Sequence, residues 1–109
     1  MTAHEAAERQ ASGALLVDIR TLEQRTRDGS IPGAVAVDRA VLEWRLDPTS
    51  PWRIREAAGS DIDVVLICAE GYSSSLAAAS LREMGLTNVT DVIDGFEGWR
   101  SAGLPIDPF

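Results

Sequence analysis

Residues 64–84 read VVLICAEGYSSSLAAASLREM, and this stretch decides the fold. The apolar residues 64–67 predict a buried strand, because central strands of parallel sheets are apolar on both faces. A short polar loop follows, and residues 74–84 then have the composition of a helix that Gly85 stops. The stretch therefore predicts a strand–loop–helix unit with Cys68, the only cysteine, at the turn.

The same alternation of strands and helices extends over the rest of the chain. Further strands are predicted at 14–17, 35–38 and 89–93, and helices at 3–11, 22–28, 41–46, 51–58 and 96–102. Strands that alternate with helices form an α/β sheet that is mainly parallel, with helices on both faces. At 109 residues the chain has the length of one domain, so we expect a single domain over 1–109 with an N-terminal helix within 1–12.

Hydroxyl residues mark the expected helix starts. Thr2 with Glu5, and Thr21 with Gln24, have the spacing of capping boxes. The serines at 73–75 are expected to supply at least one hydroxyl cap to the helix that follows the cysteine.

The aromatic residues divide into two groups. Phe96 and Trp99 are expected in the core, because aromatic side chains of a terminal helix usually pack inward. Trp44 and Trp52 stand beside arginines, so they either rim a pocket or pack against the core; the sequence leaves both readings open.

Composition excludes several classes of function. The net charge of −7 argues against binding to nucleic acid or to an anionic membrane surface. No apolar run approaches membrane-spanning length, and residues 1–10 lack the features of a signal peptide, so we expect a cytoplasmic protein. One cysteine and one histidine make neither an internal disulfide nor a zinc or iron–sulfur site.

Cys68 is the candidate nucleophile. It lies at a strand's carboxyl end and before a helix N-terminus, where unpaired backbone N–H groups favour an anion such as a thiolate. Asp18 and Arg20 also follow a strand and should reach the same edge of the sheet, where α/β folds bind ligands. We expect a structural ion pair between them rather than direct catalysis. The competing interpretation of Cys68 is an inert thiol in the core.

Four segments resemble the motifs of the rhodanese-like (sulfurtransferase) domain. Residues 16–20 resemble its Asp-x-Arg strand, and residues 29–34 resemble its Gly-His-Ile-Pro-Gly-Ala turn, with Ser30 in place of His. Residues 68–74 resemble its Cys-x-x-Gly-x-Arg-Ser loop, with Ser73 in place of Arg. Residues 94–99 resemble its Gly-Gly-Phe-x-Gly-Trp motif, with Asp94 in place of the first Gly. They stand in the family's order and place the motif-bearing part at about 15–105.

The resemblance implies a three-layer fold and a sulfur-transfer activity without a cofactor. The implied loop consists of Ala69, Glu70, Gly71, Tyr72, Ser73 and Ser74, whose backbone N–H groups would surround the sulfur of Cys68. Cys68 would take sulfane sulfur from a small sulfur-containing anion such as thiosulfate, or from a persulfide, and become a persulfide itself. The acceptor would be cyanide, a thiol or a partner protein.

The departures from the family pattern bear on the donor. Glu70 places a carboxylate in the loop and Ser73 replaces a cation, so we expect weak use of dianionic thiosulfate. A sulfur carrier with little turnover on small donors is the first alternative. A phosphatase or arsenate reductase is a weaker one, since no arginine follows the cysteine before Arg82. A protein-interaction domain with a vestigial site is the last, and the intact cysteine and glycine argue against it.

Overall fold

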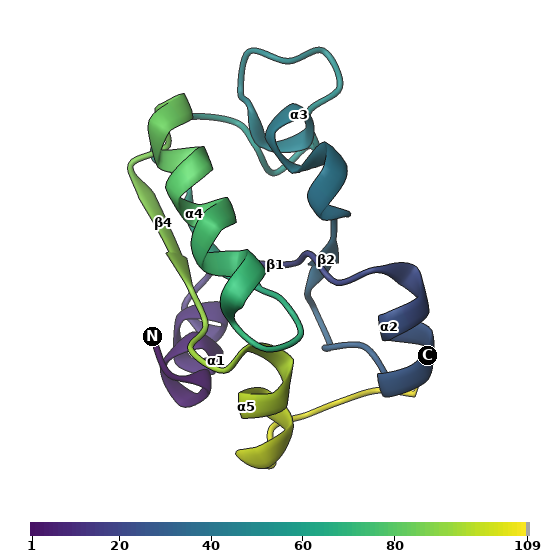
Figure 1. Cartoon of the computed structure of the whole chain (residues 1–109). Helices are drawn as coiled ribbons and strands as arrows, with labels where there is room; N and C mark the ends of the chain where they lie inside the picture. The colour runs from purple at the N-terminus through teal and green to yellow at the C-terminus, as the bar shows by residue number, and fades with distance from the viewer. Residues whose placement is uncertain (109) are drawn as a thin grey trace.

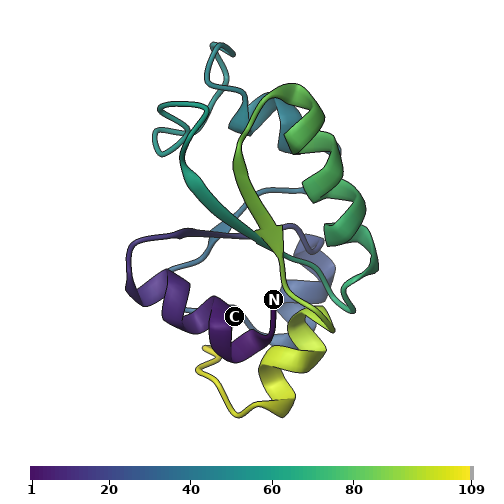
Figure 2. The same ribbon diagram turned by 90° about the vertical axis from the view of Figure 1, so that its left-hand side faces the viewer.

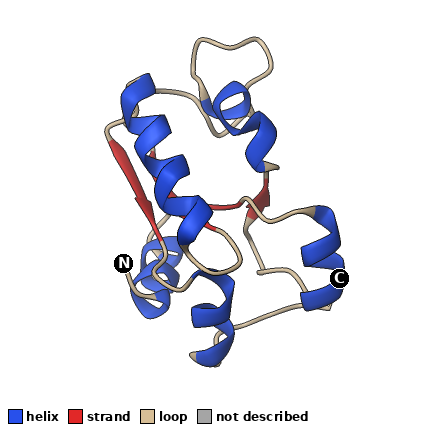
Figure 3. Cartoon of the chain, viewed as in Figure 1, coloured by secondary structure: helices blue, strands red, loops and turns tan. Residues whose placement is uncertain are grey.

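The computed structural model describes residues 1–108 and contains a parallel sheet. Its strands, red in Figure 3, are β1 (Leu15–Asp18), β2 (Val35–Ala36), β3 (Asp63–Ile67) and β4 (Asn88–Asp91). They are paired in the order β2-β1-β3-β4. All three strand pairs are parallel, so each connection crosses over one face of the sheet. The predicted parallel α/β sheet is confirmed.

Helices cover both faces of this sheet. They are α1 (Ala3–Ala11), α2 (Leu22–Asp28), the 3₁₀ turn η1 (Arg39–Val41), α3 (Leu42–Leu46), α4 (Tyr72–Met84) and α5 (Gly95–Ser101). Figure 2 shows α1 and α5 on one side of the sheet and α3 and α4 on the other, while α2 lies beside the edge near β2 (Figure 1). The expected three layers are present.

The central strand β3 explains the three layers. Its side chains alternate between the two faces, as in any strand. Val64 and Leu66 join a core cluster with residues of α3 and α4, whereas Val65 and Ile67 join a second cluster with residues of α1 and α5. All four are at most 1% exposed, which is why this strand has no polar face in the sequence.

Local capping signals predicted two helix starts correctly. Thr2 Oγ1 accepts from the backbone N–H of Glu5 at 3.2 Å, and the Glu5 carboxylate accepts from the backbone of Thr2 at 3.0 Å. Thr21 and Gln24 form the same reciprocal pair at the start of α2. Each pair satisfies two donors that a helix N-terminus leaves unpaired.

The predicted helix at 51–58 is wrong. This segment is a series of turns, in which the backbone N–H of Ile54 donates to the carbonyl of Arg45 at 2.8 Å. The guanidinium of Arg53 donates to the carbonyls of Ile54, Arg55 and Ala57 at 3.3–3.4 Å. Side-chain donors thus replace the backbone donors of a helix, a competition that propensity alone does not reveal.

Several element ends also differ from prediction, each because of a specific contact. β2 stops at Ala36, since the Asp38 carboxylate accepts from the backbone of Ala40 and turns the chain into η1. β4 stops at Asp91, since the backbone N–H of Ile93 donates to the carbonyl of Met1. No described helix has the length and apolar composition needed to cross a bilayer.

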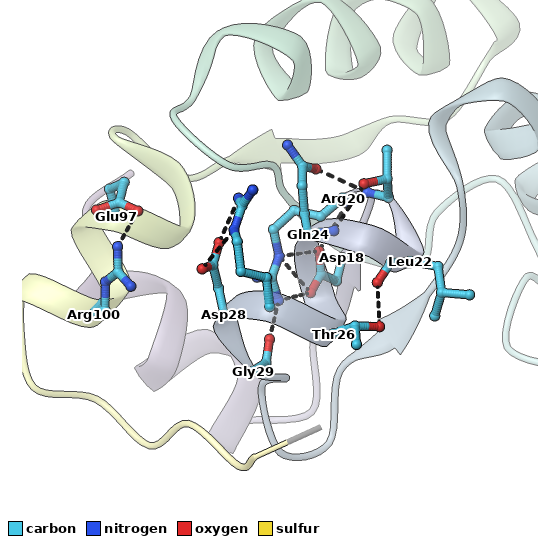
Figure 4. A network of polar contacts seen from close by, with 11 residues as sticks. Asp18, Arg20, Leu22, Gln24, Thr26, Asp28, Gly29, Glu97 and Arg100 are labelled. Carbon is cyan, nitrogen blue, oxygen red and sulfur yellow. Dashed lines mark hydrogen bonds and ion pairs between the residues drawn. The ribbon is translucent and has the colours of Figure 1, made fainter.

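A buried ion pair ties β1 to the segment after α2 (Figure 4). Arg20 donates to both carboxylate oxygens of Asp18, at 2.7 Å from Nη2, and also to the carbonyl of Gly29 at 2.8 Å. Its guanidinium carbon lies 3.8 Å from the centre of the Phe96 ring. Asp18 and Arg20 are each 2% exposed, so the expected structural ion pair is confirmed, and it is fully desolvated.

Asp18→Ala should destabilise the fold strongly, because it leaves the buried guanidinium of Arg20 without its counter-charge. We expect a loss of about 3–5 kcal/mol in the free energy of unfolding, measured by urea denaturation. Asp28→Ala is the control: it removes an ion pair whose Arg27 side chain is 63% exposed and should change stability little. Equal effects of the two variants would contradict this account.

Candidate functional site

The strand register places Cys68 at the carboxyl edge of the sheet. Ile67, the last residue of β3, is level with Asp18 of β1, and the backbone N–H of Ile19 donates to the carbonyl of Ile67 at 2.9 Å. Cys68 therefore begins its loop beside the end of β1. This is the edge at which α/β folds bind ligands.

The N-terminus of α5 sets the orientation of the loop. The backbone N–H of Phe96 donates to the carbonyl of Cys68 at 2.7 Å, and that of Glu97 donates to the carbonyl of Ala69 at 3.1 Å. In a trans peptide the N–H points opposite to the carbonyl. The N–H groups of Ala69 and Glu70 are therefore turned away from α5.

The sulfur of Cys68 occupies the position of a helix cap. It accepts from the backbone N–H of Gly71 at 3.1 Å and from that of Ser74, in the first turn of α4, at 3.3 Å. No serine hydroxyl caps α4, so the expected serine cap is wrong; the Ser75 hydroxyl donates instead to the carbonyl of Tyr72. Cys68 itself is 5% exposed. Amide donors favour negative charge on the sulfur they contact.

Four further amides of the loop have no partner. Among residues 1–108, the backbone N–H groups of Ala69, Glu70, Tyr72 and Ser73 donate no hydrogen bond. Unpaired donors next to a helix N-terminus form a binding site for an anion or for water. Two amides of the predicted loop, those of Gly71 and Ser74, therefore contact the sulfur, and the binding role of residues 69–74 stays a prediction.

Gly71 is required at the centre of this loop. It has φ +95°, a conformation that L side chains rarely adopt, and a Cβ there would lie 2.9 Å from the backbone nitrogen of Asp94. The loop and the turn before α5 are therefore in backbone contact. A side chain at position 71 would separate them.

The charged side chains around the loop are acidic. Glu70 is exposed and lines a cavity of about 450 Å³ together with Asp94, Glu97, Gly98 and Ser101. The guanidinium of Arg82 donates to the carbonyl of Val89, beyond the loop. Positive potential at the sulfur therefore comes from backbone amides rather than from a loop cation.

Arg20 contributes no direct contact to the thiol. Its hydrogen bonds go to Asp18 and Gly29, and its face lies on Phe96, which in turn hydrogen-bonds the Cys68 carbonyl. The pair thus acts as support for the element that orients the loop. Within residues 1–108, no three His, Cys, Asp or Glu side chains are grouped as metal ligands would be.

Sequence reasoning missed Asp91. Its carboxylate accepts from the hydroxyl of Ser74 at 3.2 Å, and Ser74 in turn contacts the sulfur of Cys68. The predicted strand 89–93 put Asp91 in mid-strand, whereas β4 ends at Asp91, at the same carboxyl edge as Cys68. No local motif links it to a loop that lies 17 or more residues earlier.

The two open tryptophans line one cavity. Trp44 and Trp52 are 58% and 59% exposed, with ring centres 6.1 Å apart. The cavity measures about 460 Å³ and is also lined by Val37, Val41 and Arg45. Of the two readings left open by the sequence, the pocket rim is the one the structure supports.

Comparison with known proteins agrees with this geometry. The model of the rhodanese-like domain family matches residues 2–102. The chain belongs to the rhodanese-like domain family. A Haemophilus influenzae relative named thiosulfate sulfurtransferase GlpE is 36% identical over 107 residues, covering 98% of this chain and 92% of the relative.

Two solved structures extend the comparison. A Rhodopseudomonas palustris protein of unknown function, described as a possible tyrosine phosphatase, has a TM-score of 0.88 and 38% identity, over 97% of this chain and 82% of that one. A rhodanese-like domain from Anabaena has a TM-score of 0.81 at 23% identity, over 100% of this chain and 78% of the other, which supports the fold alone.

Gly71→Ala should change the pH midpoint of Cys68 alkylation, and Gly85→Ala should not. Both glycines have positive φ, so each variant takes on about 1–2 kcal/mol of left-handed backbone strain. Only at position 71 does the new Cβ meet backbone, since nothing lies within 4 Å at position 85. We expect the wild type and Gly85→Ala to share one pH midpoint for alkylation of Cys68 by iodoacetamide. It should rise in Gly71→Ala; an equal midpoint in all three proteins would contradict the proposed loop geometry.

Proposed function

We propose that this protein is a sulfurtransferase that carries sulfane sulfur as a persulfide on Cys68. The observation that carries the proposal is the loop itself. Two backbone amides contact the sulfur, and four more are free to bind the outer sulfur or the oxygens of a donor. The name of the GlpE relatives supports thiosulfate as one donor.

The transfer takes two balanced steps. The Cys68 thiolate attacks the sulfane sulfur of thiosulfate, a new S–S bond forms, and the bond to the sulfonate sulfur breaks with its electron pair to release sulfite. The carbon of cyanide, or the sulfur of a thiolate acceptor, then attacks the outer persulfide sulfur. Thiocyanate or a new persulfide leaves, and the Cys68 thiolate is regenerated. No oxidant or reductant is needed.

Backbone amides suit the persulfide intermediate. Its charge lies on the outer sulfur, beyond Cys68 Sγ. The free amides of Tyr72 and Ser73, at the start of α4, stand next to the amides that already contact Sγ. Preorganised dipoles of this kind stabilise developing charge without reorganising.

A sulfur carrier is the first alternative; its partner would be a protein thiol or persulfide rather than a small molecule. It predicts a persulfide on Cys68 with negligible turnover of small donors. The description of the Rhodopseudomonas palustris neighbour raises phosphate-ester hydrolysis as a second alternative. Residues 69–74 contain no arginine to clamp a phosphate, so we expect no hydrolysis of p-nitrophenyl phosphate.

Cys68→Ser tests the central claim. Wild-type protein incubated with thiosulfate should gain the mass of one sulfur atom on the peptide that contains Cys68, and should then release it as thiocyanate on addition of cyanide. The variant should show neither event, because serine forms no persulfide. A stable adduct without turnover would favour the carrier, and no adduct from thiosulfate or from a small persulfide would refute both.

Glu70→Ala and Ser73→Arg should improve the use of thiosulfate. Two unit charges about 4 Å apart interact by about 4 kcal/mol at an effective dielectric of about 20, and salt and side-chain mobility reduce this severalfold. A remaining effect of about 1.4 kcal/mol corresponds to a roughly tenfold fall in KM for thiosulfate at low salt. Steady-state kinetics at low and high salt measure it.

The matched control is Glu83→Ala, which removes an exposed carboxylate at the far end of α4. It should leave KM unchanged. The gain of the loop variants should shrink as ionic strength rises, since it is a charge effect. If neither loop variant improves on wild type at low salt, Glu70 does not face the donor.

A further inference from the structure

The hydroxyl of Ser74 stands between the thiol and a carboxylate. Cys68 Sγ donates to Ser74 Oγ at 3.2 Å, and Ser74 Oγ donates to Oδ2 of Asp91 at 3.2 Å. Ser74 is fully buried at the start of α4, and Asp91 ends the neighbouring strand β4. The chain of contacts therefore runs from the candidate nucleophile to an acid on another element.

A hydroxyl carries only one hydrogen. While Ser74 directs it to Asp91, its oxygen can only accept from the sulfur, so the sulfur must carry a proton to complete the contact. A thiolate at Cys68 would have no hydrogen to give and would need the Ser74 hydrogen for itself. Asp91 and the thiolate thus compete for the same hydrogen.

We propose that Asp91 is a positioning residue for Cys68: by holding the hydroxyl hydrogen of Ser74, it keeps the resting sulfur as a protonated thiol. The proposal rests on the proposed function in one respect, that the sulfur of Cys68 is the reacting atom. Asp91 acts through Ser74 rather than through a contact with the sulfur itself.

The competition is strongest in one state of the catalytic cycle. In the thiol, the Cys68 proton fills the contact with Ser74. In the persulfide, the inner sulfur has no proton to give, but it is neutral and the charge lies one atom further out, so it competes only weakly for the Ser74 hydrogen. The bare thiolate is the state most disfavoured; its proton leaves for solvent before attack on the donor and returns after transfer. Asp91 therefore limits the lifetime of the bare, reactive thiolate.

Several other charged groups lie on the elements near Cys68, Ser74 and Asp91. On the elements packed around the three residues these are the amino group of Met1, which donates to the Asp91 carbonyl, and the side chains of Glu70, Arg82, Asp94 and Glu97. None of them contacts Ser74 Oγ among the described residues. A change confined to Asp91 therefore isolates the hydrogen bond together with one charge.

Asp91→Asn is the decisive variant. The asparagine amide can donate to Ser74 Oγ, which frees the hydroxyl hydrogen for the sulfur. We expect the pH midpoint of thiolate ultraviolet absorbance to fall by about one unit. Alkylation at neutral pH should be about threefold faster, since the thiolate becomes about tenfold more abundant but about threefold less nucleophilic. Cys68 is the only cysteine, so no other thiol contributes.

Two controls separate the hydrogen bond from the charge. Asp94→Asn removes a carboxylate from the adjacent turn, at a positive φ that asparagine tolerates, and should move the midpoint much less. In a Ser74→Ala background, Asp91→Asn should lose most of its effect. An unchanged or higher midpoint in Asp91→Asn, or the same fall with and without Ser74, would overturn the proposal.

These measurements use no sulfur donor. A protein that fails to transfer sulfur but shows the midpoint shift would refute the proposed function and leave the role of Asp91 standing. An active sulfurtransferase whose Cys68 midpoint is the same with and without Asp91 would support the proposed function and refute the role of Asp91.

Discussion

The arrangement of the site depends on two hydrogen bonds at the start of α5. Phe96 and Glu97 donate to the carbonyls of Cys68 and Ala69, and this fixes which way the peptide planes of the loop face. With the carbonyls turned toward α5, the amides are left for the sulfur side. The Gly-Phe-x-Gly-Trp segment, residues 95–99, therefore helps to orient the loop although it lies far from Cys68 in the sequence. The buried Asp18–Arg20 pair supports the start of α5, because the Arg20 guanidinium packs on the Phe96 ring.

Charge at the site is controlled by dipoles and not by cations. Backbone amides already lie in the folded chain, so they stabilise an anion without the desolvation cost that a buried arginine carries. The loss of a cation at Ser73, where the family motif has arginine, is therefore a smaller loss for anion binding than the motif alone suggests. The exposed Glu70 and the acidic cavity beside it act on what approaches from solvent, where their field is screened by salt. The interior of the site thus offers donors to an anion, and we propose that its acidic surroundings select against highly charged donors.

The sequence was sufficient for the layers and for the position of the thiol, because both depend on local patterns. An apolar run with no polar face predicts a central strand, and a cysteine between that strand and a helix predicts the carboxyl edge. It failed where backbone groups find side-chain partners at a distance. The Arg53 side chain donates to carbonyls of the predicted helix at 51–58. The sulfur of Cys68 accepts the amide hydrogen bond that a serine hydroxyl was expected to accept. Such choices depend on which groups meet in space.

Asp91 illustrates the same limit at the site. A carboxylate two contacts away from a nucleophilic sulfur works against ionisation, although the amides around the sulfur work for it. The opposition is useful for a sulfur carrier of either kind, since a permanently ionised thiol is open to oxidation and alkylation between transfers. Under the proposed function, amides next to the outer sulfur of a persulfide, together with an acid that disfavours the bare thiolate most, would make the loaded state the favoured anionic form of this site. The preference would depend on a single hydroxyl hydrogen, that of Ser74, for which Cys68 and Asp91 compete.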